Sequence, residues 1–375
     1  MRYMVELRNR SFELMDRLED EVLDLRWSYS RIGGCGEFGF RLPRKLFEEK
    51  SVAGDFNIRV YTRASLTGTY SLVYQGLIEN KTPAVEGHTE TIGISGHGYS
   101  AQLPRIYISN GALAKTYVSQ EVSIIVKSLL DNYITPDTDI TYSASDIEVT
   151  SFTPDLIEFS TDAMSALQTL ADLVGGREWG VDKNRNFFFK ARSTTVGFKY
   201  HFGKELTSFD ENQDFASIAN RAIVQGAQSG GTYFFETFND TASQIKYGVR
   251  SEVLQNSSIV TSAVASQFAE AFFDERGEVL RKATADLAVQ EAVLEGTAPV
   301  PLVNVIKKGI RYGQKKYGTF LYAGIVGRVI NRINYSISRA GSMNVSLDLG
   351  KPPSSLSEEI KKLEYSLEQN RTSGI

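Results

Sequence analysis

The 375-residue chain is poor in cysteine, histidine and long apolar runs, and each shortage excludes a class of protein. Its one cysteine, Cys35, excludes an internal disulfide and a metal site built from several cysteines. A single cysteine also fits synthesis and assembly in a reducing cytoplasm. No stretch of about 18 apolar residues is present, so we expect no stable membrane insertion. The first residues, MRYMVELRNRSFELM, carry charges every few positions, unlike a signal peptide.

Positively charged residues are slightly fewer than negatively charged ones, 41 against 45. The formal net charge is −4, which argues against a general nucleic-acid binder, because such proteins carry a basic face. Charged residues make up 23% and hydrophobic residues 42%, a composition typical of a folded globular protein. The length favours two to four domains. Thirty-one glycines against nine prolines suit a chain of many strands and turns.

Few motifs in the sequence carry chemistry. Gly34–Gly39 matches the spacing G-x-G-x-x-G, but a strand-like stretch ending at Pro43 follows where a dinucleotide site needs a helix. We therefore expect a barrel turn there and no cofactor. The segment Gly93–His97 resembles a nucleophile elbow, with His97 in place of the last glycine. The three histidines are scattered, so a zinc site or a catalytic triad would depend on His97 alone. We expect no metal site and no enzyme.

One basic cluster is compatible with a solvated loop, or with contact to an acidic partner or DNA; its members are Lys307, Lys308, Arg311, Lys315 and Lys316.

Residues 1–112 alternate between apolar and polar positions in several short runs, a pattern typical of β-strands. Strands are predicted near 22–30, 38–42, 58–61, 72–78 and 89–96, with a glycine-rich turn at 32–39. The spacing of the runs predicts a small antiparallel β-barrel domain.

Residues 113–200 are predicted to form an α+β insert. Apolar residues at helical spacing predict a helix over 118–133, beginning near Tyr117–Ser119 and ending before Pro136. A second helix is predicted at 161–174, because Thr161 and Asp162 can cap it and Gly175 can end it. A two-stranded hairpin should follow at 177–190 with a polar turn at 182–185.

Residues 201–351 should return to strands and form a second small antiparallel barrel. A polar loop that begins at Phe209 is predicted to lead into a strand at 222–224, with further strands at 233–235 and 245–247. A helix is predicted at 262–276, then strands at 280–289, 303–311, 320–338 and 342–349. Four aromatic residues could form an exposed binding platform, a core or a subunit interface: Tyr233, Phe234, Phe235 and Phe238.

Residues 352–375 are predicted to form a short C-terminal helix. Ser355 and Glu358 fit a capping box, and the apolar residues follow a heptad spacing: Leu356, Ile360, Leu363 and Leu367. This seam could pack on copies of itself, on a partner, or back onto its own domain. Taken together, the fold class is mainly β with an α+β insert.

The order of these elements resembles the baseplate hub proteins at the tip of phage tails. This fold is shared with the late control proteins of contractile-tailed phages and the N-terminal part of type VI secretion spike proteins. The resemblance depends on four stretches that fit the family's pattern: Tyr74–Ile78 with Tyr99–Leu103, the helix and hairpin with Trp179 and Asp182, Ala219–Gly226 with Asn220 and Gly226, and Leu347–Gly350.

The resemblance implies a structural, non-enzymatic protein of the virion, assembled in the host cytoplasm. Three copies, each with two barrels, would form a pseudo-sixfold ring that continues the hexameric tail tube. DNA or tape-measure protein would pass through its lumen, and three subunits would carry a net charge of about −12. The insert would lie outside the tube, with Trp179 as a core anchor rather than a ligand platform.

The implied partners are a distal tail or tail tube protein, the tape-measure protein, and a tail fibre or spike protein at the C-terminal end. No extra enzymatic domain is seen after the hub-like part, which favours a long flexible tail over a contractile one. A cell-wall hydrolase and a carbohydrate- or receptor-binding β module are the alternatives.

Overall fold

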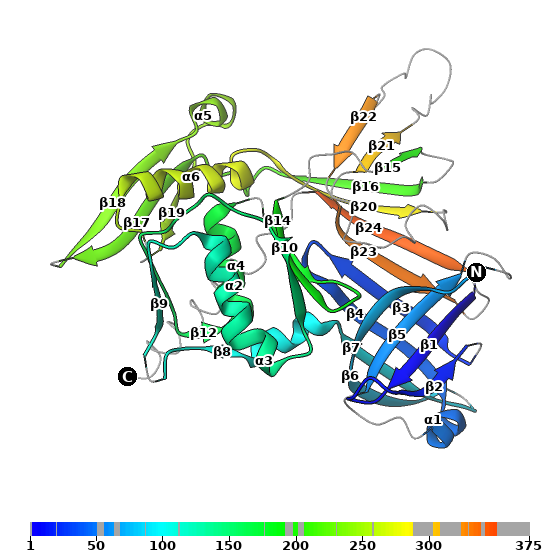
Figure 1. Cartoon of the computed structure of the whole chain (residues 1–375). Helices are drawn as coiled ribbons and strands as arrows, with labels where there is room; N and C mark the ends of the chain where they lie inside the picture. Colours follow the sequence, from blue (N-terminus) through cyan, green and yellow to red (C-terminus); the bar gives the residue numbers. More distant parts are fainter. Residues whose placement is uncertain are drawn as a thin grey trace, which may run out of the picture.

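The computed structural model is mainly β, as the sequence predicts (Figure 1). The residues that it describes are 2–19, 21–50, 56–63, 68–86, 88–111, 113–175, 177–191, 198–201, 206–229, 231–256, 259–287, 303–307, 324–328, 330–338 and 342–350. The predicted C-terminal helix lies outside these residues, and so does most of the basic cluster that begins at Lys307. No helix in the described part of the chain is long and apolar enough to cross a membrane.

One long sheet joins strands from the two ends of the chain. Its N-terminal strands are β1 (Arg2–Arg8), β2 (Leu14–Leu18), β3 (Leu23–Ser30), β4 (Ile32–Pro43), β5 (Asn57–Arg63), β6 (Ser71–Glu86) and β7 (Thr89–His97). Its C-terminal strands are β16 (Leu206–Asp214), β20 (Leu280–Leu287), β23 (Ile330–Ile337) and β24 (Met343–Gly350). They are hydrogen-bonded in the order β16-β20-β24-β23-β3-β4-β7-β6-β5-β1-β2.

Strands β3 and β23 join the two halves of this sheet. They pair antiparallel, with Trp27 opposite Tyr335, and these two rings stack with 5.0 Å between their centroids. Both side chains belong to a single hydrophobic core that includes residues of β1 to β7 and of β20, β23 and β24. The strands of the two expected barrels therefore share one sheet and one core. The domain boundaries at 112 and 201 stay a prediction.

The insert packs beside this sheet around a second core (Figure 1). Its helical segments are α2 (Val122–Leu129), the π-helical turn η2 (Leu130–Ile134), α3 (Thr135–Asp137) and α4 (Ala163–Val174). Its strands are β9 (Lys115–Val118), β10 (Thr141–Ile147), β11 (Leu156–Phe159), β12 (Thr161–Asp162), β13 (Arg177–Val181) and β14 (Asn186–Ala191). Two elements that precede residue 113 pack with them, the helical segment η1 (Tyr99–Arg105) and the strand β8 (Tyr107–Ile108).

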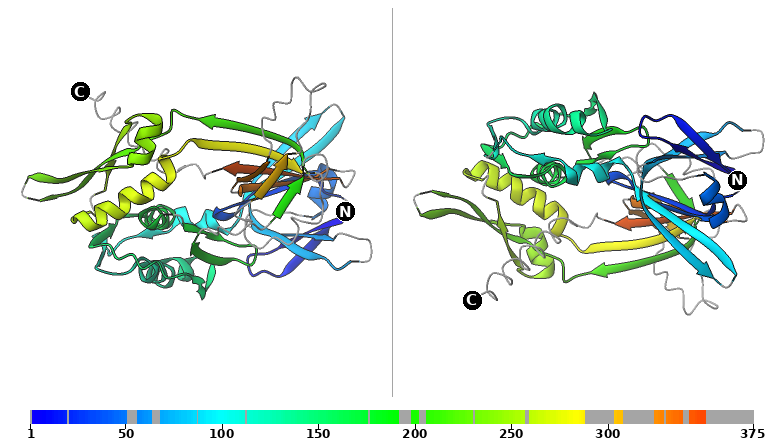
Figure 2. Two further views of the ribbon diagram at one scale, coloured as in Figure 1. Left: turned by 90° about the horizontal axis from the view of Figure 1, so that it is seen from above. Right: turned by 90° about the horizontal axis from the view of Figure 1, so that it is seen from below.

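A three-stranded unit from the second half of the chain packs on the insert. It contains β17 (Arg221–Ser229), β18 (Thr232–Asn239), α5 (Thr241–Tyr247), β19 (Ser251–Gln255) and α6 (Ser262–Arg276). Figure 2 shows α6 running alongside the helices of the insert. The approach is close, because a Cβ added to Gly175 at the end of α4 would lie 2.7 Å from the Cβ of Ala271. A further sheet consists of β15 (Phe198–His201), β21 (Val303–Lys307) and β22 (Gly324–Arg328).

Several predicted elements are confirmed with small shifts. The helix predicted at 262–276 is α6, and the helix at 161–174 is α4, with Asp162 as its N-cap. The hairpin at 177–190 is β13–β14. The helix predicted at 118–133 begins later, at Val122, because the Glu121 side chain accepts hydrogen bonds from the first free backbone N–H groups. It also continues through η2 into α3, which contains Pro136 near its start.

Three other predictions were wrong. The glycine-rich segment 32–39 is not a turn but part of strand β4, and the helix α1 (Arg44–Lys50) follows directly after Pro43. The polar segment near 209–216 belongs largely to strand β16, because alternation on a half-exposed strand places polar residues on one face. The strand predicted at 245–247 is the end of helix α5, which Asp240 caps by accepting from Ser243 N.

Candidate functional site

The most extensive feature of the described surface is one polar side of the long sheet. Along each strand, alternate side chains enter the core, such as Phe38 and Phe40 on β4 or Ile333 and Tyr335 on β23. The residues between them point the other way and are mostly short and polar. We call this side of β6, β7, β4, β3, β23, β24, β20 and β16 the polar face.

The strand register aligns the residues of the polar face in rows across the sheet. One row contains Asn80, Ser95, Gly39, Arg26, Ser336 and Asn344. The next contains Ser28, Asn334, Ser346, Asp286 and Ser208. Serine and asparagine dominate both rows. Since these side chains are short and mostly uncharged, the face offers few groups that would hold a passing polymer tightly.

Charges on the polar face are paired around the β3–β23 junction and acidic towards β16. Arg332 lies 3.6 Å from Glu37, and Arg41 forms an ion pair with Asp24. Towards β16 the face carries three carboxylates: Asp210, Asp286 and Asp348. Ser208 donates a hydrogen bond to Asp286, and Asn334 donates one to Asp348. The surface is therefore weakly negative towards β16.

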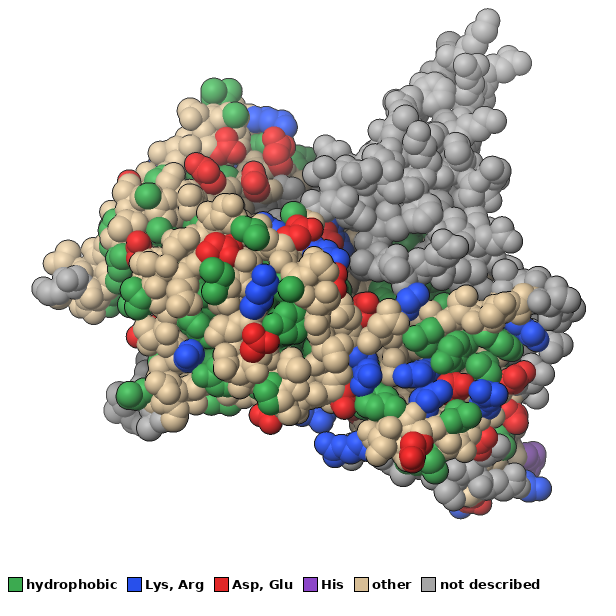
Figure 3. Space-filling view, viewed as in Figure 1, with side chains coloured by type: hydrophobic (Ala, Val, Ile, Leu, Met, Phe, Trp, Pro, Cys, Tyr) green, Lys and Arg blue, Asp and Glu red, His purple; other side chains and the backbone are tan. Residues whose placement is uncertain are grey.

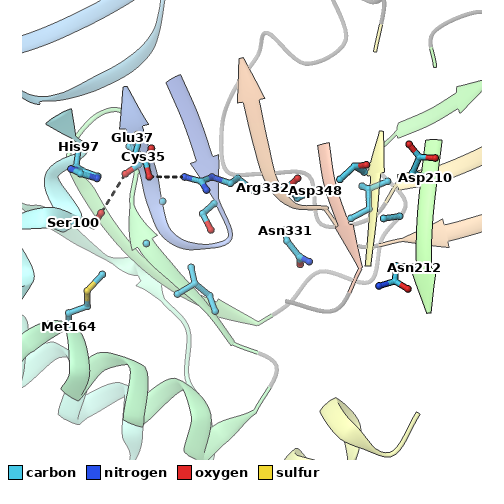
Figure 4. A pocket seen from close by; sticks show the side chains of 18 of the residues that line it. Cys35, Glu37, His97, Ser100, Met164, Asp210, Asn212, Asn331, Arg332 and Asp348 are labelled. Carbon is cyan, nitrogen blue, oxygen red and sulfur yellow. Dashed lines mark hydrogen bonds and ion pairs between the residues drawn. The ribbon is translucent and has the colours of Figure 1, made fainter. Parts of the chain in front are cut away.

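Two hollows mark this face. A cavity of about 530 Å³ lies over the middle of the sheet, between residues such as Arg26, Gly93 and Asn344. A larger one of about 790 Å³ lies where the sheet meets the insert, and Met164 of α4 helps to line it. Figure 4 shows Glu37, Arg332 and Asp348 around this larger cavity, together with Cys35, His97 and Ser100.

The larger cavity is lined by a cysteine, a serine and a histidine, residue types that enzymes often use. Here each of them is buried or bonded to a neighbouring group of the fold. Burial raises the pKa of the Cys35 thiol to about 12, so the thiol is protonated and unreactive at neutral pH. Ser100 donates to the backbone oxygen of Cys35, at 3.5 Å. The His97 Nδ1 atom lies 2.6 Å from a carboxylate oxygen of Glu79, on the outer edge. In the described part of the chain, no three His, Cys, Asp or Glu side chains gather as a metal site requires.

Trp179 and Asp182 lie in the β13–β14 hairpin and hold it together. Trp179 is buried, stacks on Phe187, and donates its indole N–H to the Gln168 side chain of α4 at 3.1 Å. Asp182 closes the turn, because its carboxylate accepts from the backbone N–H groups of Asn184 and Asn186, each at 2.8 Å. Both residues are structural, and Trp179 offers no exposed face to a ligand.

Asn220 lies directly before β17 and Gly226 lies within it, far along the chain from the hairpin. The fully buried Asn220 side chain donates to the Gly248 carbonyl at 2.8 Å and accepts from Arg250 N at 2.8 Å. Gly226 permits a close crossing, since a Cβ there would lie 2.2 Å from the backbone oxygen of Ile259. The four described site residues thus lie in two separate places, two of them in the hairpin and two along β17 and the residue before it. The other four lie outside the described residues: Leu356, Ile360, Leu363 and Leu367.

The four aromatic residues of β18 divide between its two sides. Phe234 and Phe238 pack against the second core, whereas Tyr233 and Phe235 are exposed. The two exposed rings meet edge to face, with 6.3 Å between their centroids. They do not form a flat platform.

Sequence reasoning missed the junction between the hairpin and the long sheet. Strand β13 pairs in parallel with the start of β4, where Gly33 and Gly34 both have positive φ. A Cβ on Gly34 would lie 2.2 Å from the backbone oxygen of Val181, so only glycine allows this approach. The buried Arg31 forms an ion pair with Glu178 at the same junction. The sequence signal for this junction was the run of glycines in segment 32–39, because the close approach of β13 requires glycine at position 34.

The fold defines the chain as one of the mainly β proteins built like phage tail proteins. A prophage MuSo2 43 kDa tail protein from Shewanella oneidensis is similar with a TM-score of 0.65 at 13% identity, covering 94% of this chain and 99% of that one. A tail protein from Neisseria meningitidis MC58 gives 0.63 at 14% identity, covering 93% and 96%. The prophage tail protein gp18 from Listeria monocytogenes EGD-e gives 0.58 at 12% identity, covering 98% and 100%.

No family model and no curated protein sequence matches the chain. At 12–14% identity these similarities establish the fold.

Proposed function

We propose that the chain is a structural baseplate hub of a phage tail tip. Three copies form a ring that continues the hexameric tail tube and lets DNA or tape-measure protein pass during infection. The observation that carries this proposal is the polar face, which runs without interruption over eight strands drawn from both ends of the chain. The full-length likeness to three phage tail proteins supports the same role.

The strand order fits a threefold ring that matches a sixfold tube. The polar face divides at the β3–β23 pairing into four strands from the first hundred residues and four from the C-terminal half. Three copies would then supply six such groups of four strands. A pseudo-sixfold ring is the arrangement that can contact a hexameric tube subunit by subunit.

The two ends of the polar face supply edges that a ring would pair. Strand β16 hydrogen-bonds to β20 on one side only, among the described residues. In β6, residues 71–77 pair with β5, while beyond Ile78 the described pairing is with β7 alone. Open strand edges invite pairing with other chains, and a closed ring covers them. The next copy's β16 would therefore lie beside the outer half of β6.

A pore lined by the polar face would suit passage. Most of its side chains are short, and the unbalanced charge towards β16 is negative, so DNA phosphates would be repelled from that part of the pore rather than held. The insert and the three-stranded unit that contains α6 lie beside the sheet, where they would support the outside of the ring (Figure 1). This role requires no catalysis and no cofactor.

Such a hub would contact a distal tail or tail tube protein on one side of the ring and the tape-measure protein within it. A tail fibre or spike protein would attach through the C-terminal end, with the 352–375 heptad as its candidate element. The protein would reside in the virion at the tail tip after assembly in the host cytoplasm. We favour a tail of the long flexible type.

The mass of the purified chain in solution tests the ring, together with one edge variant. We expect a trimer of the 41.7 kDa chain. Val85→Lys places a charge on a side chain that is 67% exposed near the tip of β6, and should shift the population towards monomer. Ile245→Lys, at an 85% exposed position on α5 away from the sheet, is the matched control and should stay trimeric. A wild-type monomer at every concentration would overturn the proposal.

A further inference from the structure

The outer side of β2, β1 and β5 carries a cluster of arginines that the ring does not explain. The inward side chains of these strands, such as Val5, Leu7 and Val60, are fully buried in the core. On the other side, Glu6 lies between Arg17 on β2 and Arg59 on β5. We call the outward residues Arg8, Arg17, Arg59 and Arg63, together with Glu6, the arginine face. Figure 3 shows Lys and Arg side chains gathered over β1 and β5, with acidic side chains among and beside them.

The carboxylate of the arginine face, Glu6, already forms ion pairs with two of its arginines. Glu6 accepts from Arg8 at 2.8 Å and from Arg17 at 3.2 Å, and it is only 3% exposed. Burial alone would raise the pKa of Glu6, but the two arginines outweigh it and hold the pKa below its ordinary value. Glu6 is therefore ionised at neutral pH and neutralises part of the charge of Arg8 and Arg17.

Among the residues that the structure describes, no carboxylate forms an ion pair with Arg59 or Arg63. The Nε atom of each is buried without a hydrogen bond. Arg63 lies over the ring of Tyr70, 4.6 Å from its centroid. Such stacking fixes the guanidinium but does not cancel its charge. Two oriented and partly desolvated cations thus face outward, which strengthens their attraction for an anion.

The surroundings of these cations have the composition of a protein interface. Leu14 and Met15 on β2 are 43% and 55% exposed, and Tyr61 lies between Arg59 and Arg63 on the same side of β5. Arginine, tyrosine and methionine are the residues enriched in the cores of protein interfaces. Among the described strands, β2 is also the last of the long sheet and pairs with β1 alone, so its other edge could pair with a strand of another chain.

We propose that the arginine face is the docking site for an acidic, extended segment of a partner protein. Arg59 and Arg63 are four residues apart on one strand, so two carboxylates about 13 Å apart would each meet one guanidinium. The apolar side chains of Leu14 and Met15 would pack beside the segment. We favour a peptide over nucleic acid, because the side chains of an extended peptide can pack on the exposed apolar side chains of Leu14 and Met15, which a phosphate backbone cannot use. This proposal goes beyond the hub role and does not depend on it.

Fluorescence anisotropy with the full chain tests the docking site. The probe is a labelled nonapeptide of alternating glutamate and threonine, its matched control has glutamine in place of glutamate, and a single-stranded oligonucleotide of equal charge tests for nucleic acid. We expect the acidic peptide to bind best and the double variant Arg59→Gln/Arg63→Gln to bind it about tenfold more weakly. The control Arg44→Gln/Arg105→Gln removes the same charge from exposed arginines elsewhere and should bind like the wild type.

Three results would overturn the proposal. The first is equal weakening by the control variant, which would mean that only net charge matters. The second is tighter binding of the oligonucleotide than of the peptide. The third is loss of the trimer in the Arg59/Arg63 variant, which would make the face a contact between copies of this chain. The variant Arg59→Lys/Arg63→Lys keeps the charge and is the control for misfolding. It should retain most of the binding. A wild-type chain that stays monomeric would contradict the proposed ring but not the proposed docking site.

Discussion

Asn220 joins three separate backbone segments at one buried point. Its amide donates to Gly248 O and to Ser243 Oγ, and its oxygen accepts from Arg250 N. Ser243 in turn donates to the carbonyl of Gly277 after α6. The asparagine thereby ties α5, β19 and α6 to the start of β17. Sequence reasoning selected Asn220 by resemblance, but its role follows from contacts 23 to 30 residues away.

Replacing this asparagine should be costly. Asn220→Ala removes a buried side chain and leaves two partly buried backbone groups, Gly248 O and Arg250 N, without its hydrogen bonds, and we expect it to reduce the free energy of unfolding by about 2 kcal/mol. Urea denaturation of the purified chain measures this. Asn344→Ala, on the exposed polar face, should change the stability by less than about 0.5 kcal/mol. Equal effects of the two substitutions would show that the Asn220 contacts do not stabilise the fold.

Glu121 makes the insert sensitive to acid. Burial raises the pKa of its carboxyl, but hydrogen bonds from Ser123 and Thr150 outweigh this and leave the pKa below its ordinary value of 4.5. A carboxyl with a lowered pKa in the folded state stabilises the protein above the unfolded pKa and loses that contribution as the pH falls through the folded pKa. The insert should therefore weaken as the pH falls below about 4.5.

Melting temperatures at pH 7 and pH 4 check this expectation. Glu121→Gln should lower the melting temperature at pH 7 and narrow the difference between the two pH values. Glu270→Gln, on the exposed side of α6, serves as the control and should leave the difference unchanged. If Glu121→Gln keeps the full pH difference, Glu121 is not the group responsible.

The junction of β4 with the β13–β14 hairpin shows how glycine positions decide which elements can meet. Gly34 has φ of +76° and no room for a Cβ against Val181, whereas a Cβ on Gly93 would meet nothing closer than 3.5 Å. We expect Gly34→Ala to destabilise the chain by about 3 kcal/mol or more and to increase amide exchange in β13. Gly93→Ala should cost less than about 1 kcal/mol. Similar exchange in β13 for both variants would contradict this account of the junction.

Local patterns predicted those elements whose stability is local. The helix at 262–276 and the hairpin at 177–190 follow from apolar spacing, capping and turn chemistry within a few residues. The segment 32–39 was misread because its glycines serve a contact with residues 179–181, far away in sequence. The α5 helix was misread as a strand because Asp240, which caps it, lies outside the short apolar run 245–247.

At the scale of the molecule, the decisive pairing joins the two ends of the chain. Strand β3 pairs with β23, which lies about 300 residues further along the chain. No local sequence pattern predicts which strands become neighbours at such a separation. The polar face could not be predicted either, because it exists only once eight strands are aligned in register. What the sequence did contain was the alternation on each strand, such as Met343 to Leu349, which separates the polar face from the core.

A three-dimensional image of the assembled ring by electron microscopy tests the central claim most directly. The account predicts three copies around an axis, with the polar face towards the pore and β16 of each copy beside the outer half of β6 of the next. It also predicts the insert on the outside. A different symmetry, or a ring whose pore is lined by other surfaces while Asp210, Asp286 and Asp348 face outward, would contradict it.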